Sequence, residues 1–297
     1  MNSDGGQRRP SDLKLHALIG LMTLVWACNF IVVKKIGAHL PSFFLATLRT
    51  VVAGACIAPI YFHKPRVPFR PGDLKALLIM GIAGIALNQI AFVLGLARTS
   101  VAHAAIVNAL TPVQVLLVAA WRGQEHITAR KAIGLATAAA GVLWLQLGKA
   151  STAGATLFGD FLMWSGTFLF AVFSVYARDY TKRLGSIGVT GFGFISSAIA
   201  CLPFALWSGA QLDLSAVPLW AWIGVVYMAA FSSVMGYLIF NYAVSWLPAS
   251  RVAAFLYSTP ILASLMGWLV LGEALTIAVG VSAALVLGGV MLVERSR

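Results

Sequence analysis

Ten stretches of this 297-residue chain are apolar over the length of a helix that crosses a lipid bilayer. Such a helix needs about 20 mostly apolar residues. The gaps between the stretches are short and carry glycine, proline, lysine or arginine, as in Phe62–Pro68. The sequence therefore predicts an all-α integral membrane protein with ten transmembrane helices, at residues 15–34, 41–62, 74–97, 99–121, 128–147, 156–177, 187–208, 216–244, 249–271 and 275–293.

Composition excludes the main alternatives. Hydrophobic residues make up 60% of the chain and charged residues 10%, whereas soluble domains have roughly 45–50% and about 25%. A net charge of +12 in a soluble protein would suggest a nucleic-acid partner, but these basic residues lie between apolar runs, so no such partner is expected. Cys28, Cys56 and Cys201 lie inside apolar runs without metal-binding spacing, so neither a metal nor a cofactor is expected.

The basic residues also predict an orientation in the membrane. Sixteen of the 21 lysine and arginine residues lie at gaps or termini on the side of the N-terminus, and four lie at gaps on the other side. The remaining one, Arg49, is inside a span. Because cytoplasmic loops are enriched in lysine and arginine, we expect both termini to be cytoplasmic.

An internal repeat divides the chain into two halves. A shift of 148 positions places Thr111–Pro112 on Thr259–Pro260, and places Glu125, Thr128, Gly141 and Val142 on identical residues. We therefore predict homologous halves at residues 1–150 and 151–297. Five spans per half is an odd number, so the second half enters the membrane inverted. Inverted repeats are typical of secondary transporters, whose substrate site lies near the midplane between the repeats.

These features resemble the EamA-type members of the drug/metabolite transporter superfamily. The resemblance rests on Gly272–Thr276 followed by a glycine-rich last helix, on Trp26–Phe30 and on Arg49, although the first copy of the Gly-Glu pair is interrupted at Gly123–Glu125. Within the superfamily the sequence is most similar to YddG-type amino-acid exporters. The resemblance implies location in the bacterial inner (plasma) membrane and a central cavity lined mainly by the first, third, fourth, sixth, eighth and ninth spans.

Candidate substrate-binding residues are polar and aromatic side chains deep inside spans, because polar groups at that depth face the bundle interior or a cavity. The alternatives are interhelical hydrogen bonds, worth about 1 kcal/mol each, and ordinary aromatic packing. The candidates are Trp26, Asn88, Gln89, Phe92, His103, Asn108, Trp164, Tyr237, Asn241 and Tyr257.

Candidate hinges are the prolines and glycines inside spans. Pro112 and Pro260 each free the carbonyl four residues earlier, and this backbone is tolerated in a membrane only where it faces protein or a watery cavity. We expect these carbonyls to border the substrate site, with packing as the alternative role. Gly81, Gly84 and Gly236 are further candidate hinges.

The charged residues narrow the mechanism. All nine acids lie at span ends or in loops, and no phosphate-binding Gly-x-x-x-x-Gly-Lys motif is present. Arg49 either holds a substrate carboxylate or has a structural role. The structural role is favoured, because the second span is peripheral in the superfamily that this sequence resembles. His103 is the candidate proton-coupling group.

We therefore predict a transporter, not an enzyme, whose only partners are a small-molecule substrate and the lipid bilayer. It is expected to export neutral or zwitterionic metabolites by alternating access and facilitated diffusion, and the resemblance implies amino acids, including hydrophobic and aromatic ones. The alternatives are a proton-coupled drug/metabolite antiporter and, with less support, an intramembrane hydrolase using Ser282 and His103. The oligomeric state stays open, and a monomer is compatible with the sequence.

Overall fold

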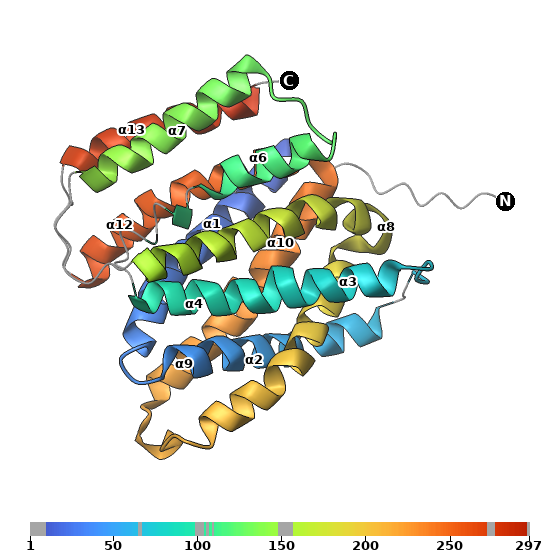
Figure 1. The fold of residues 1–297 in the computed structure, drawn as a ribbon. Helices are drawn as coiled ribbons and strands as arrows, with labels where there is room; N and C mark the ends of the chain where they lie inside the picture. The colour runs from blue at the N-terminus through green and yellow to red at the C-terminus, as the bar shows by residue number, and fades with distance from the viewer. Residues whose placement is uncertain are drawn as a thin grey trace.

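The computed structural model describes residues 10–64, 67–98, 104, 107, 108, 110–147, 157–271 and 277–295, and the regular elements in these residues are all helical (Figure 1). In the first half the elements are α1 (Asp12–Ile36), α2 (Ser42–His63), α3 (Asp73–Gly81), the π-helix η1 (Ile82–Leu87), α4 (Asn88–Arg98), α6 (Thr111–Trp121) and α7 (Ala129–Leu147).

The second half begins with α8 (Leu157–Gly209), the longest helix described. It continues with the 3₁₀ turn η2 (Leu214–Ala216), α9 (Leu219–Tyr227), the π-helix η3 (Met228–Met235), α10 (Gly236–Trp246), α11 (Ala249–Ala254), the 3₁₀ turn η4 (Phe255–Tyr257), α12 (Ser258–Leu271) and α13 (Ile277–Arg295).

The helices fall where the apolar runs lie. Five helical runs in the described residues are long and apolar enough to cross a membrane: 12–36, 42–63, 73–98, 158–209 and 219–246. The all-helical class is therefore confirmed, whereas the count of ten spans in two inverted repeats stays a prediction.

Helix ends follow local chemistry. The Ser11 side chain accepts a hydrogen bond from the Lys14 backbone at the start of α1, and the Thr128 hydroxyl accepts one from the Lys131 backbone (3.3 Å) at the start of α7, as helix caps do. A single residue, Gly185, divides α8 into two arms, residues 157–184 and 186–209. Its φ of 75° is a conformation that glycine adopts readily.

The two arms of α8 pack against different parts of the first half. Gly166 in the first arm lies against Asn88 and Ala91 of α4, whereas Phe194 and Ala198 in the second arm lie against α2. On the other side of the bundle α1 packs on α10 and α12, and α7 lies beside α13 (Figure 1). Helices that are remote in the sequence therefore meet around the centre of the molecule.

A cluster of aromatic side chains fills the middle of the bundle. The Tyr237 ring lies 5.1–6.1 Å, centroid to centroid, from the rings of Trp26, Phe170, Phe173 and Phe194. Most of these pairs are edge-to-face, the arrangement that favours aromatic contacts.

At one end of the bundle, polar side chains join the two halves. Asp179 of α8 accepts hydrogen bonds from Arg122 (3.2 Å) and Gln124 (2.9 Å), which follow α6. The buried Glu125 carboxylate accepts hydrogen bonds from the Ser250 backbone (3.2 Å) and hydroxyl.

Arg183 and Asp73 add an ion pair (2.6 Å) between α8 and α3 at the same end. We call these contacts of Asp73, Arg122, Gln124, Glu125, Asp179, Arg183 and Ser250 the end latch.

Candidate functional site

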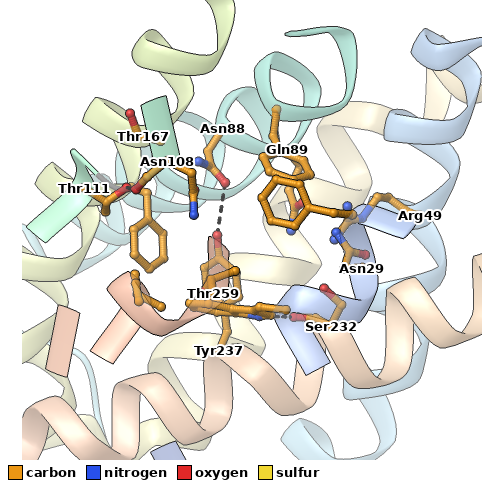
Figure 2. A pocket seen from close by; sticks show the side chains of 15 residues that line it. Asn29, Arg49, Asn88, Gln89, Asn108, Thr111, Thr167, Ser232, Tyr237 and Thr259 are labelled. Carbon is orange, nitrogen blue, oxygen red and sulfur yellow. Dashed lines mark hydrogen bonds between the residues drawn. The ribbon is translucent and has the colours of Figure 1, made fainter. Parts of the chain in front are cut away.

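A small cavity lies where helices of both halves meet (Figure 2). Its volume is about 80 Å³, and it is bounded by α1, α2, α4, α6, α8, η3, α10, η4 and α12. The lining residues are Trp26, Asn29, Phe30, Arg49, Asn88, Gln89, Phe92, Asn108, Thr111, Thr167, Phe170, Ser232, Tyr237, Leu256 and Thr259.

Six of the ten residues expected to bind substrate line this cavity: Trp26, Asn88, Gln89, Phe92, Asn108 and Tyr237. Hydrogen bonds fix several of them. The Trp26 indole donates to the Ser232 carbonyl (2.8 Å). The Tyr237 hydroxyl donates to the Asn88 side-chain oxygen (3.2 Å) across the cavity (Figure 2), and the Asn88 amide nitrogen donates to the carbonyl of Gly166 in α8 (2.7 Å).

The other four candidates are not among the lining residues. Trp164 is 44% exposed on α8, where it stacks with Phe161 and Phe168. Asn241 is buried and donates to the Thr190 hydroxyl (2.8 Å), an interhelical bond between α10 and α8. Tyr257 is buried in a separate apolar cluster with Leu135 and Val286. His103 lies outside the described residues, as does the Ser282 side chain of the hydrolase alternative.

Two π-helices beside the cavity have no counterpart in the sequence predictions. The residues of η1, shifted by 148 positions, become 230–235, which lie inside η3. In η3 the Ser233 hydroxyl donates to the Met228 carbonyl five residues earlier (2.9 Å). π-Helical turns are rare and occur frequently at functional sites, so this pair marks the segments flanking the cavity.

The glycines expected to be hinges lie at close helix contacts. A Cβ atom on Gly81 would lie 2.3 Å from the Ser196 hydroxyl, one on Gly84 would lie 2.5 Å from Phe173, and one on Gly236 would lie 2.4 Å from the Trp26 indole nitrogen. None of the three has a positive φ. Close packing therefore accounts for glycine at these positions, and movement there stays a prediction.

Pro112 lies at the start of α6 rather than in the middle of a continuous described helix. The carbonyl of Asn108, four residues earlier, accepts a hydrogen bond from the Thr111 hydroxyl (2.6 Å). This carbonyl therefore has a partner beside the cavity. Pro260 lies inside α12, and its side chain is outside the described residues.

Several lining residues were not singled out from the sequence as binding residues. Thr111 and Thr259 lie one position before the repeated prolines, and both line the cavity, so the repeat itself could have indicated them. Arg49, which the sequence analysis left between two roles, also lines the cavity, next to Asn29 (Figure 2).

A family model described as the EamA-like transporter family matches residues 14–147 and again residues 157–295. This chain belongs to the EamA-like transporter family. An uncharacterized transporter of Archaeoglobus fulgidus is 26% identical over 96% of this chain and 100% of its own length. A probable amino-acid metabolite efflux pump of Salmonella typhimurium is 25% identical over 92% of each chain.

A solved crystal structure shares the fold, with a TM-score of 0.74, 18% identity, and coverage of 95% of this EamA-like chain and 96% of the other. Family membership places the helices in a membrane. The resemblance inferred from the sequence is thereby confirmed.

The cavity of this EamA-like transporter combines amide and hydroxyl groups with aromatic rings and one guanidinium group. None of the lining residues is an aspartate or a glutamate, and the described residues contain no group of three His, Cys, Asp or Glu side chains that could hold a metal ion. Ligand pockets usually measure about 300–1,000 Å³. The cavity, at about 80 Å³, is smaller than such pockets.

Proposed function

We propose that this chain exports neutral or zwitterionic amino acids, including hydrophobic and aromatic ones, across the bacterial inner membrane. The observation that carries the proposal is the cavity between helices of both halves, in which Trp26 and Phe170 offer aromatic surface beside the amides of Asn88 and Gln89. Such a lining suits a solute with an apolar side chain and a few polar groups. The name of the Salmonella relative, a probable amino-acid metabolite efflux pump, is consistent with this substrate class.

Two inverted halves, residues 1–150 and 151–297, are part of this proposal. The family model matches twice along the chain. Three pairs of residues separated by 148 positions line the cavity from opposite halves: Gln89 and Tyr237, Asn108 and Leu256, and Thr111 and Thr259. This placement supports alternating access, in which one half rocks against the other around a central site.

The proposed mode is facilitated diffusion with both termini on the cytoplasmic side. No carboxylate lines the cavity, so the lining offers no acidic group for carrying a proton. The alternative, a proton-coupled drug/metabolite antiporter, depends on a titratable group such as His103 outside the described residues.

Uptake of a labelled amino-acid panel into proteoliposomes tests the function. We expect neutral amino acids with apolar side chains to move down their gradients, at rates that an imposed pH gradient leaves unchanged. Movement of cationic drugs or sugar phosphates in place of neutral amino acids would overturn the substrate class. Strong acceleration by the pH gradient would overturn facilitated diffusion and favour the antiporter.

Cysteine labelling in inverted membrane vesicles tests the topology. Lys149→Cys and Lys182→Cys are expected on opposite faces of the membrane, because the sixth predicted span, residues 156–177, lies between them. Labelling of both by an impermeant reagent from one face alone would contradict the inverted halves.

A further inference from the structure

Arg49 is a buried cation at the wall of the central cavity. Its side chain is 2% exposed, and its Nη2 atom donates to the Ser233 hydroxyl (3.0 Å). Its Nε and Nη1 atoms have no hydrogen-bond partner among the described residues. Since a guanidinium group carries five N–H donors, one neutral hydroxyl leaves most of its hydrogen-bonding capacity unused.

No acidic side chain compensates the charge of Arg49 in the cavity. The other residues that line the cavity are neutral, among them Asn29, Gln89 and Ser232. Four acids hydrogen-bond elsewhere: Asp73, Glu125 and Asp179 belong to the end latch, and Asp213 accepts a hydrogen bond from Ser215 in the turn after α8. A buried charge without a counter-ion is strongly unfavourable, and intramembrane charges of this kind usually serve function.

Arg49 lies among buried polar side chains, some of which hydrogen bonds hold in place. Ser233, its partner, sits in the π-helix η3 and also accepts a longer hydrogen bond from Gln89 (3.4 Å). Asn29, which lies near Arg49 (Figure 2), is buried and has a side-chain oxygen without a partner. Two polar side chains, each more than nine-tenths buried, thus have unused groups at one end of the cavity. Arg49 offers N–H donors and Asn29 an acceptor oxygen, and of these only the donors can bind a carboxylate.

We propose that Arg49 binds the carboxylate of the transported solute, which is the counter-ion that the cavity lacks. Arginine suits this role because its planar donors match the two oxygens of a carboxylate. The apolar part of the solute then lies toward Trp26 and Phe170. This inference rests on the proposed transport function and narrows its substrate class to carboxylate-bearing solutes with an apolar body.

Equilibrium binding to the purified full-length protein measures how much the carboxylate contributes to the affinity of a ligand. The probes are L-phenylalanine, phenylpropionate, which lacks the ammonium group, and phenylethylamine, which lacks the carboxylate. We expect phenylethylamine to bind about tenfold to a hundredfold more weakly than the other two, as befits loss of a charge-assisted hydrogen bond. Carboxylates that bind no more tightly than the amine would overturn the proposal.

Variants identify the residue responsible. Arg49→Gln is expected to weaken the binding of both carboxylates by a similar factor and to leave the affinity for phenylethylamine unchanged. Arg49→Lys is expected to restore part of the lost affinity for the carboxylates. Arg130→Gln, which removes an exposed arginine of α7, is the matched control and should bind all probes as the wild type does. Equal loss of all three probes in Arg49→Gln would indicate a structural role and contradict the proposal.

Transport assays keep this inference distinct from the proposed function. If no amino acid is transported but phenylpropionate binds in an Arg49-dependent manner, amino-acid export fails and the carboxylate site stands. If amino acids are transported at equal rates by the wild type and a well-folded Arg49→Gln variant, the carboxylate site fails and export stands. Should Arg49→Gln not fold, the probe series on the unmodified protein and on the Arg49→Lys variant still shows whether the solute carboxylate binds at Arg49.

Discussion

Three of the polar side chains that have a buried, unpaired atom line the cavity. Asn29, Arg49 and Thr259 line it, and each has at least one buried nitrogen or oxygen atom without a hydrogen-bond partner among the described residues. Proteins leave few such atoms, because each one carries an unrecovered desolvation penalty. Other such atoms lie elsewhere in the described residues, among them those of Gln114 and Trp246. At the cavity, the unpaired donors of Arg49 are the ones that the proposed carboxylate site uses.

Asn29 offers a test of this trade between stability and function. Asn29→Leu removes the unpaired side-chain oxygen at nearly constant volume, so we expect Tm to be unchanged or to rise, and amino-acid uptake to fall. The matched control is Asn241→Leu. The Asn241 side-chain oxygen is likewise unpaired, but its amide nitrogen donates to Thr190, so this change also leaves a buried hydroxyl without its partner. It should destabilise the protein by about 1–3 kcal/mol. Thermal unfolding and uptake are measured on both, and a clear loss of stability in Asn29→Leu would contradict this interpretation.

Gly236 is the residue on which the position of Trp26 depends. The new Cβ of Gly236→Ala would come within 2.4 Å of the Trp26 indole nitrogen, which donates to the Ser232 carbonyl. We expect the indole to shift, with a loss of about 1–3 kcal/mol in stability and slower transport. Gly280→Ala in α13 meets no atom within 4 Å and serves as the control. Identical melting and uptake curves for the two variants would refute the prediction.

At the level of elements, the apolar runs were sufficient to predict the helices, because a span needs only length and hydrophobicity. The π-helices were not predictable, since Ile82–Leu87 has the composition of any apolar helix and the Ser233 side chain is placed partly by its contact with Arg49. Trp164 shows the other limit: a helix that is apolar all round does not reveal which face points to the cavity.

The π-helix η3 predicts an unusual response to deletion. A π-helical turn holds an extra residue, so deletion of Phe231 within η3 can restore an α-helix while α10 keeps its place. Deletion of Val226 in α9 instead rotates the following residues by about 100°. We expect the Phe231 deletion to fold and to lose transport, and the Val226 deletion to misfold. Size-exclusion profiles and uptake check this, and equal misfolding of the two would contradict it.

For the whole molecule, the end latch joins the two halves at one end of the cavity. Asp179→Asn weakens its bonds to Arg122 and Gln124, so we expect the cavity to open more often toward that end. The measurement is the labelling rate of Thr259→Cys, in a background without native cysteines, by an impermeant thiol reagent applied from the latch side. Asp213→Asn, whose bonds stay within its own turn, is the control. An unchanged labelling rate in Asp179→Asn would show that the latch does not restrict access.

The single-residue joint at Gly185 has a mechanical consequence. The first arm of α8 carries Phe170 at the cavity, the second arm packs on α2, and no loop separates them. If a solute binds against Phe170 and tilts the first arm, we expect the tilt to reach α2, which bears Arg49. Solute binding at the first arm and movement of α2 are in this way coupled through Gly185. Extra flexible residues inserted at Gly185 are expected to uncouple them.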